Sequence, residues 1–84
     1  MPIFTFRFDL YGQPNGQDEA DFPDQATAIA AARQELERRV DGIKAGVAVA
    51  QGAASTEDVE WLGRWDWSAR DGSLWRPDGS RPVL

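Results

Sequence analysis

The first segment of the chain alternates between apolar and polar side chains. Its apolar positions are Phe4, Phe6, Phe8 and Leu10, and the positions between and after them are Thr5, Arg7, Asp9 and Tyr11. A repeat of two residues with aromatic side chains is typical of a strand that has one buried face. The pattern therefore predicts a strand over residues 3–11, with the phenylalanine row in the core.

A turn is predicted after this strand. Pro14 fixes its own φ angle and Asn15–Gly16 tolerates positive φ angles, so residues 12–16 have the composition of a turn. Residues 17–22 can return as a short second strand anchored by Phe22. The acidic residues in this segment suit only the edge of a sheet, where they stay in contact with water.

Residues 24–41 are predicted to form the main helix. Asp24 is a suitable N-cap, because its carboxylate accepts hydrogen bonds from backbone N–H groups that have no partner within the helix. The residues that follow contain no glycine or proline before Gly42 and are rich in alanine, glutamate and arginine. Glu35 and Arg39 lie one turn apart and are expected to form an ion pair.

The sequence leaves the end of this helix open. Apolar residues three or four positions apart form one stripe that does not stop at Gly42, the expected C-terminal stop. The members of the stripe are Ile29, Ala32, Leu36, Val40, Ile43 and Val47. Residues 42–56 are accordingly predicted as a loop or as a second short helix.

A hairpin is predicted over residues 58–77, followed by a frayed tail over residues 78–84. One face of the first strand is expected to contain Val59, Trp61, Trp65 and Trp67. Gly63 interrupts this row and suggests a bulge.

The hairpin loop sets the expected register of its two strands. The segment Arg70–Asp71–Gly72 has the composition of a three-residue loop closed by a glycine with positive φ. With that loop, Trp67 pairs with Trp75 and Asp66 pairs with Arg76, and both pairings are of favourable type.

Together these elements predict a single α+β domain over residues 1–84. The N-terminal strand and the C-terminal hairpin form a small antiparallel sheet, and the main helix packs against it. A chain of 84 residues is too short to divide into two hydrophobic cores.

Several segments taken together are similar to a known group of proteins. These segments are Pro2 with Phe4-Thr5-Phe6, the acidic stretch from Asp18 to Asp24, the alanine-rich run from Ala28 to Leu36, and the strand–turn–strand region from Trp65 to Leu74. They resemble a family of short uncharacterised bacterial proteins, a domain of unknown function common in alphaproteobacteria. The resemblance is best over residues 1–40. Phe22 stands where the family has leucine, and the resemblance implies a fold but no function.

Charge and composition narrow the function classes. Nine basic and 14 acidic residues give a net charge of −5, which argues against direct binding to nucleic acid or to an anionic membrane surface. The chain contains no histidine and no cysteine, so the usual general base and the usual metal ligands are missing. The expectation is a protein without catalytic residues, metal or cofactor. The first residues do not resemble a signal peptide, so a soluble cytoplasmic protein is expected.

Acidic residues form the main candidate binding site. The expected partner-binding residues are Asp18, Glu19, Asp21, Glu57, Asp58 and Glu60. Like charges this close repel one another, so they are either solvated or bound to a positive partner. A divalent cation site is the weaker alternative, because the spacing lacks the glycine-containing loop of calcium-binding hands.

Tryptophans form the second, weaker candidate. Trp61 and Trp65 are the expected aromatic contacts to a partner, since tryptophan is enriched in binding hot spots. The alternative is that the tryptophans build the core, and Trp67 and Trp75 are the pair expected to be structural.

Two functional hypotheses follow from these surfaces. The first is a small acidic protein-interaction module whose partner is another protein with a basic surface. In its sharper form it is an inhibitor that covers a nucleic-acid-binding surface, as small acidic phage-encoded inhibitors such as anti-CRISPR proteins do. The second is a structural or self-associating domain, a homodimer formed through its tryptophan strand or an edge strand. An enzyme is a distant third, since it would require a pocket with two or more carboxylates of raised pKa.

Overall fold

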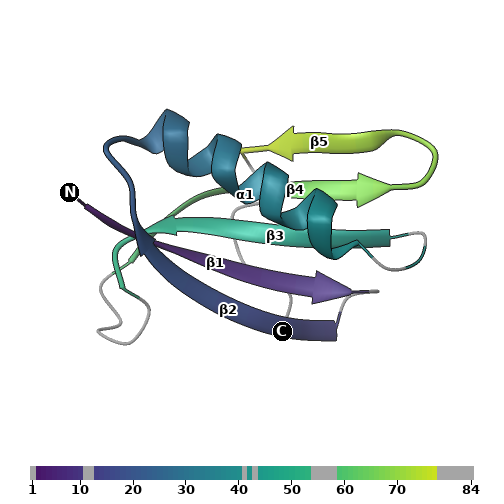
Figure 1. Cartoon of the computed structure of the whole chain (residues 1–84), viewed down its shortest axis with the longest axis horizontal. Helices are drawn as coiled ribbons and strands as arrows, with labels where there is room; N and C mark the ends of the chain where they lie inside the picture. Colours follow the sequence, from purple (N-terminus) through teal and green to yellow (C-terminus); the bar gives the residue numbers. More distant parts are fainter. Residues whose placement is uncertain (1, 11–12, 41, 43, 54–58, 78–84) are drawn as a thin grey trace.

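The structure, a computed structural model of the whole chain, describes residues 2–10, 13–40, 42, 44–53 and 59–77. Within these ranges one antiparallel sheet is covered on one face by one helix, which confirms the α+β class (Figure 1). The elements are β1 (Ile3–Leu10), β2 (Gln13–Asp21), α1 (Gln25–Arg39), β3 (Lys44–Gln51), β4 (Glu60–Ser68) and β5 (Gly72–Arg76). The strand order is β2-β1-β3-β4-β5, so β2 and β5 form the two edges of the sheet.

The predicted phenylalanine row of β1 is confirmed. Phe4, Phe6 and Phe8 are buried on the face of the sheet that α1 covers, the helix face. Phe22 lies against this row, with its ring 5.5 Å from that of Phe6 and 6.0 Å from that of Phe4. The other buried apolar residues of this core are Ala28, Ala32 and Leu36 from α1, and Ala45, Val47 and Val49 from β3.

Helix α1 begins at the predicted cap and ends before the predicted stop. The Thr27 backbone N–H donates to Asp24 Oδ1 at 2.8 Å, as expected of an N-cap. Val40 already leaves the helical conformation, with φ −58° and ψ 128°. The sequence had left open whether the helix ends at Gly42 or continues to Val47, and the structure ends it at Arg39. The expected pair of Glu35 and Arg39 is present at 3.5 Å.

Hydrogen bonds to three carboxylates on α1 and its cap give the fold a predicted acid sensitivity. The pKa of Asp24 is lowered by the Thr27 N–H, that of Glu35 by Arg38, and that of Glu37 by the Ser73 hydroxyl. A lowered pKa in the folded state means that the ionised form stabilises the fold. This contribution is complete above the ordinary carboxyl pKa of about 4 and is lost as the pH falls through the lowered values.

We expect the urea midpoint of the wild type to fall between pH 5 and pH 3 and to change less in Glu37→Gln. Ser73→Ala removes the main hydrogen bond to Glu37 and is expected to reproduce part of that effect. Because Asp24 and Glu37 are exposed and Glu35 is half-buried, water screens these interactions and the differences are small. A Glu37→Gln variant whose midpoint falls as much as that of the wild type would contradict the assignment.

The central strand β3 corrects the prediction for residues 42–56. Lys44–Gln51 was expected to be a loop or a second short helix, and it is a strand between β1 and β4. All residues from Ala45 to Ala50 are buried, so both faces of β3 are covered. Such a strand has no alternation of apolar and polar residues. Its glycine and alanines also have low strand propensity, and packing between two neighbours decides its conformation.

Strand β2 is longer than predicted. It runs over Gln13–Asp21, so Pro14, Asn15 and Gly16 belong to the strand and not to the expected turn. The pairing of β1 with β2 shifts between Arg7 and Asp9, and Gly16 has a φ angle of 106°. Gly16 therefore lies at an irregularity of the ladder, where the backbone needs a positive φ that glycine adopts without strain. Residues 11–12 lie outside the described part of the chain.

The C-terminal hairpin is confirmed, but its register differs from the prediction. Ser68 pairs with Gly72, and Trp65 pairs with Trp75, so Trp67 is not the partner of Trp75. Gly72 has a positive φ of 72°, but it is the first residue of β5 and not the last residue of the loop. The loop therefore lies one residue earlier than expected. The Asp71 N–H also donates to Ser68 Oγ at 3.1 Å, which closes the loop. Residues 78–84, the predicted tail, lie outside the described residues.

A bulge at Gly63 moves one tryptophan to the other face of the sheet. Val49 pairs with Gly63 and Ala50 pairs with Trp61, so Leu62 is the extra residue. The suspected irregularity is therefore present. The predicted single row of tryptophans was wrong, because Trp61 lies on the face opposite α1, here called the second face, while Trp65 lies on the helix face.

Candidate functional site

Strand β2 places the first predicted acidic group at an edge of the sheet. β2 has β1 as its neighbour on one side, and all nine of its residues are exposed. They include Asp18, Glu19 and Asp21 and no basic residue. An exposed edge strand offers both its side chains and its backbone groups to a partner.

The pairing with β1 divides these three carboxylates between the two faces. Asp18 lies opposite Phe6 and therefore on the helix face. There its carboxylate accepts a hydrogen bond from Arg39 Nη2 at 2.5 Å. The same guanidinium lies 4.1 Å from the ring centre of Phe8. The charge of Asp18 is thus balanced within the fold.

Glu19 and Asp21 lie on the second face. They are the Cα partners of Thr5 and Ile3, respectively. Among the described residues neither carboxylate takes part in an ion pair. Two negative charges two residues apart on one face of an edge strand are therefore available to a positive partner.

The second predicted acidic group does not join the first within the described structure. Glu60 is exposed at the start of β4, where it pairs with Gln51 on the helix face. Two strands, β1 and β3, separate it from β2. Glu57 and Asp58 lie outside the described residues.

The two predicted aromatic residues lie on opposite faces of the sheet. Trp61 lies on the second face, 5.2 Å from the guanidinium carbon of Arg7. Trp65 lies on the helix face, where its indole N–H donates to the Ile29 carbonyl at 2.8 Å and its ring is 5.2 Å from that of Trp75. Both side chains are half-buried and make contacts within the fold.

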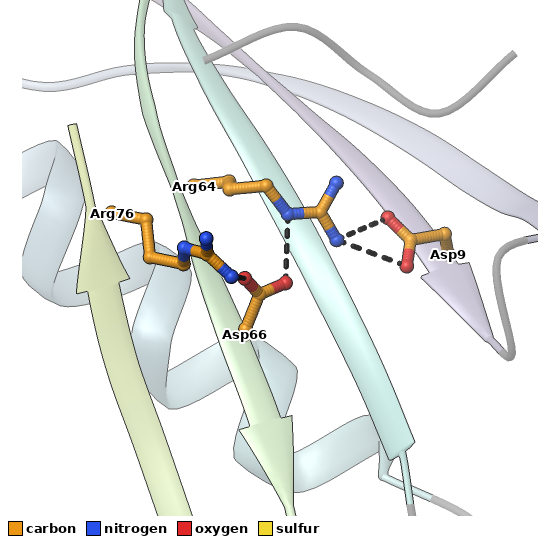
Figure 2. Close-up of polar contacts among 4 residues, drawn as sticks. All are labelled: Asp9, Arg64, Asp66 and Arg76. Carbon is orange, nitrogen blue, oxygen red and sulfur yellow. Dashed lines mark hydrogen bonds and ion pairs between the residues drawn. The ribbon is translucent and has the colours of Figure 1, made fainter. Parts of the chain in front are cut away.

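A chain of four charged side chains crosses the second face, and only its Asp66–Arg76 part was predicted from the sequence (Figure 2). Arg64 Nη2 lies 2.9 Å from Asp9 Oδ2, and Arg64 Nε donates to Asp66 Oδ1 at 2.8 Å. Arg76 Nη1 reaches the other oxygen of Asp66 at 3.3 Å. Asp66 and Arg76 were expected to be paired residues, and they meet diagonally because Asp66 is the Cα partner of Leu74.

The ion pair between β1 and β4 passes over β3 at Gly46. Asp9 and Arg64 are each only 8% exposed. A Cβ atom at Gly46 would collide with Arg64 Nη2 and would lie 3.0 Å from Asp9 Oδ1. A glycine at this position therefore leaves the space through which the two side chains meet.

This network has the properties of a structural element. Its signs alternate from Asp9 to Arg76, so each charge has an opposite neighbour. A paired buried charge orders the groups around it and leaves little net charge for a ligand. The charges of this network are therefore balanced by one another. Glu19 and Asp21 of β2 differ, because neither forms an ion pair with a described residue.

A groove of about 570 Å³ runs beside α1 on the helix face. Its apolar lining comes from Ile29, Ala30 and Trp65, and its charged lining comes from Arg33 and Glu37. These two charges form an ion pair at 3.3 Å, and Glu37 also accepts a hydrogen bond from Ser73 at 2.7 Å. The groove thus contains one carboxylate, which is already bound.

The residues that the structure describes contain no group of three or more acidic side chains placed to hold a metal ion. No helix among them is long and apolar enough to cross a membrane.

Comparison with protein-family models, with curated proteins and with solved structures gives no match to the chain. The family resemblance of the first forty residues stays a prediction.

Proposed function

We propose that the protein is a small acidic protein-interaction module that contacts a basic surface of a partner protein through β2. One observation carries the proposal: β2 is a fully exposed edge strand of nine residues that contains three carboxylates and no cationic side chain. Two of these carboxylates, Glu19 and Asp21, have no ion-pair partner among the described residues. We propose the cytoplasm as the compartment of the protein.

Electrostatics gives such a surface a defined role. A patch of one sign raises the rate of encounter with a patch of the opposite sign, and it disfavours partners of like charge. In its sharper form the proposal is an inhibitor that occupies a basic nucleic-acid-binding surface of its partner. The net charge of −5 favours contact with the basic surface of the partner protein and disfavours contact with the nucleic acid that the partner binds.

Self-association through the tryptophans has less support. Trp61 is stacked on Arg7, and Trp65 is hydrogen-bonded to α1 and packed against Trp75. These side chains are engaged within one copy of the chain. The carboxylates of Glu19 and Asp21, in contrast, are exposed and project from an edge.

The test is capture of partners from a bacterial lysate by the tagged wild type and by two variants. Glu19→Lys changes the proposed surface, and Asp71→Lys is the matched control. Both variants change the net charge equally, and Asp71 is exposed in the loop between β4 and β5, at the opposite side of the sheet. Circular dichroism spectra equal to the wild type establish that both variants are folded.

We expect the wild type and Asp71→Lys to capture the same protein and Glu19→Lys to lose it. The complex should weaken between about 50 and 500 mM salt, because screening acts on exposed charges. Nucleic acid added to the purified complex should displace the acidic protein. Equal capture by both variants, or a complex that neither salt nor nucleic acid disturbs, would overturn the proposal.

A further inference from the structure

We propose that β2 takes up its partner by strand addition, and that the added segment has lysine or arginine at every second residue. The inference rests on the proposed function, since it names the chemistry of the partner at the same site. It follows from three features of β2: the direction of its backbone groups, the faces of its side chains, and the charges already balanced within the fold.

The direction of the backbone groups comes from the hydrogen bonds at the end of the β1–β2 ladder. The Phe22 N–H donates to the Pro2 carbonyl at 3.1 Å, so Pro2 and Phe22 form a hydrogen-bonded pair. In an antiparallel ladder such pairs alternate with pairs that are not hydrogen-bonded. Even-numbered residues of β2 near this end therefore direct their backbone groups toward β1.

Odd-numbered residues of β2 then direct their backbone groups toward the open edge. On the other side of β1, the Gly52 N–H donates to the Ile3 carbonyl at 2.7 Å, which fits the same alternation. The N–H and C=O groups of Glu19 and Asp21 consequently face away from the sheet. They are the groups that an added strand would meet.

The side chains of the same two residues set the chemistry of the added strand. Residues directly opposite each other in a β-ladder place their side chains on the same face, about 5 Å apart. The partner residues opposite Glu19 and Asp21 are therefore two positions apart and lie on the second face. Opposite charge at both positions matches the two unpaired carboxylates.

The position between them has a different requirement. It lies on the helix face opposite Ala20, a small residue paired with Phe4. The nearest carboxylate on that face, Asp18, is already bound by Arg39. A third cation is therefore not needed there, and the expected pattern is basic, small or apolar, basic.

A second copy of this chain does not meet the requirement. Its β2 would bring further carboxylates to the edge. Its other edge strand, β5, has the sequence Gly-Ser-Leu-Trp-Arg, with Arg76 as its one cation, followed by Pro77. Proline has no backbone N–H to donate to a ladder. The expected occupant is a different, basic protein segment.

The test uses fluorescent nine-residue peptides of equal composition and measures their affinity by anisotropy. One peptide alternates lysine and threonine, and its isomer has all lysines together. Two further versions of the alternating peptide are N-methylated, one on the lysine amides and one on the threonine amides. When lysine faces Glu19 and Asp21 in an antiparallel ladder, its own amide points to β2, while the threonine amide points away.

We expect the alternating peptide to bind at least about tenfold more tightly than its isomer, and methylation of the lysine amides to weaken binding by about tenfold, because ladder hydrogen bonds are lost. Methylation of the threonine amides should change little. Glu19→Gln should weaken binding several-fold, and Asp18→Asn should not, because Asp18 faces the other side.

The outcomes separate this inference from the proposed function. Equal affinity of the two isomers, or equal effects of the two methylations, overturns strand addition. If strand addition is overturned in this way but Glu19→Lys still loses the captured partner, the proposed function of β2 as an acidic contact surface remains valid. If neither the peptides nor the partner respond to Glu19→Lys, both proposals are wrong.

Discussion

Replacement of Arg64 with methionine is expected to lower the free energy of unfolding by about 3–5 kcal/mol, the typical cost of breaking a buried ion pair from one side. Asp9 would lose its ion-pair partner at a site where it is only 8% exposed. Asp66 would lose its contact with Arg64 but would retain Arg76. Urea denaturation followed by tryptophan fluorescence measures the change, which is large against the stability of a domain of this size.

A double variant separates the cost of leaving Asp9 without its ion-pair partner from the other effects of the substitution. Asp9→Leu combined with Arg64→Met removes both buried charges, and such replacements are often neutral or stabilising. We expect the double variant to be more stable than Arg64→Met alone. If the losses of the two single variants simply add, the two side chains are not coupled and the network is not structural.

Gly63→Ala is the second substitution with a large expected effect. A Cβ atom at this position would lie 2.5 Å from Cζ2 of Trp75 and 3.0 Å from the backbone oxygen of Arg76. The Trp75 ring is already packed against Trp65, with ring centres 5.2 Å apart, so it has little room to move. We expect a loss of about 2–3 kcal/mol from overpacking. Thermal unfolding measured by near-ultraviolet circular dichroism also reports the tryptophan pair.

Gly72→Asn is the matched control for this substitution. Gly72 has positive φ, but no atom lies within 4 Å of a Cβ placed there. Asparagine tolerates this backbone conformation better than most residues, so the expected change in stability is small. A Gly63→Ala variant as stable as the wild type would show that the bulge does not hold Trp75 against β4.

The elements with strong local signals could be predicted from the sequence. The alternation of Phe4, Phe6 and Phe8 predicts β1, and the cap at Asp24 predicts the start of α1. Both signals act over a few neighbouring residues. Strand β3 has no such signal, because Gly46 and its alanines are small and both faces are buried. The apolar stripe keeps its helical spacing up to Val47 by coincidence, because Val40 caps the end of α1 and Val47 lies in β3.

Register was harder to predict than the existence of the strands. The choice between Gly72 as the last loop residue and Gly72 as the first strand residue moves the partner of Trp75 from Trp67 to Trp65. Each alternative is consistent with the composition of the loop. The hydrogen bond from Asp71 to Ser68 and the bulge at Gly63 favour the observed register, and both depend on neighbouring strands.

The candidate site was predictable in its residues but not in its geometry. Composition alone identifies the acidic residues of β2. Their division into one balanced and two available carboxylates depends on Arg39, which is 21 positions from Asp18. The network on the second face joins Asp9 and Arg64 across 55 positions. Contacts over such separations follow from the strand order, which the sequence did not provide.

These charges together explain why the edge of the sheet is the proposed site. Arginines balance Asp9, Asp66 and Asp18 within the fold. Glu19 and Asp21 lie at an edge where no strand of the described residues pairs with the outer side of β2. The surface therefore combines unpaired charge with an open ladder.

The most direct test of strand addition is amide hydrogen exchange of single β2 residues with and without the alternating lysine–threonine peptide. The outward amides of Glu19 and Asp21 should exchange rapidly in the free protein and become protected in the complex. The amide of Ala20, which points to β1, should change little. Protection of α1 near Trp65, or binding of the peptide with no protection of Glu19 and Asp21, would contradict the proposed site.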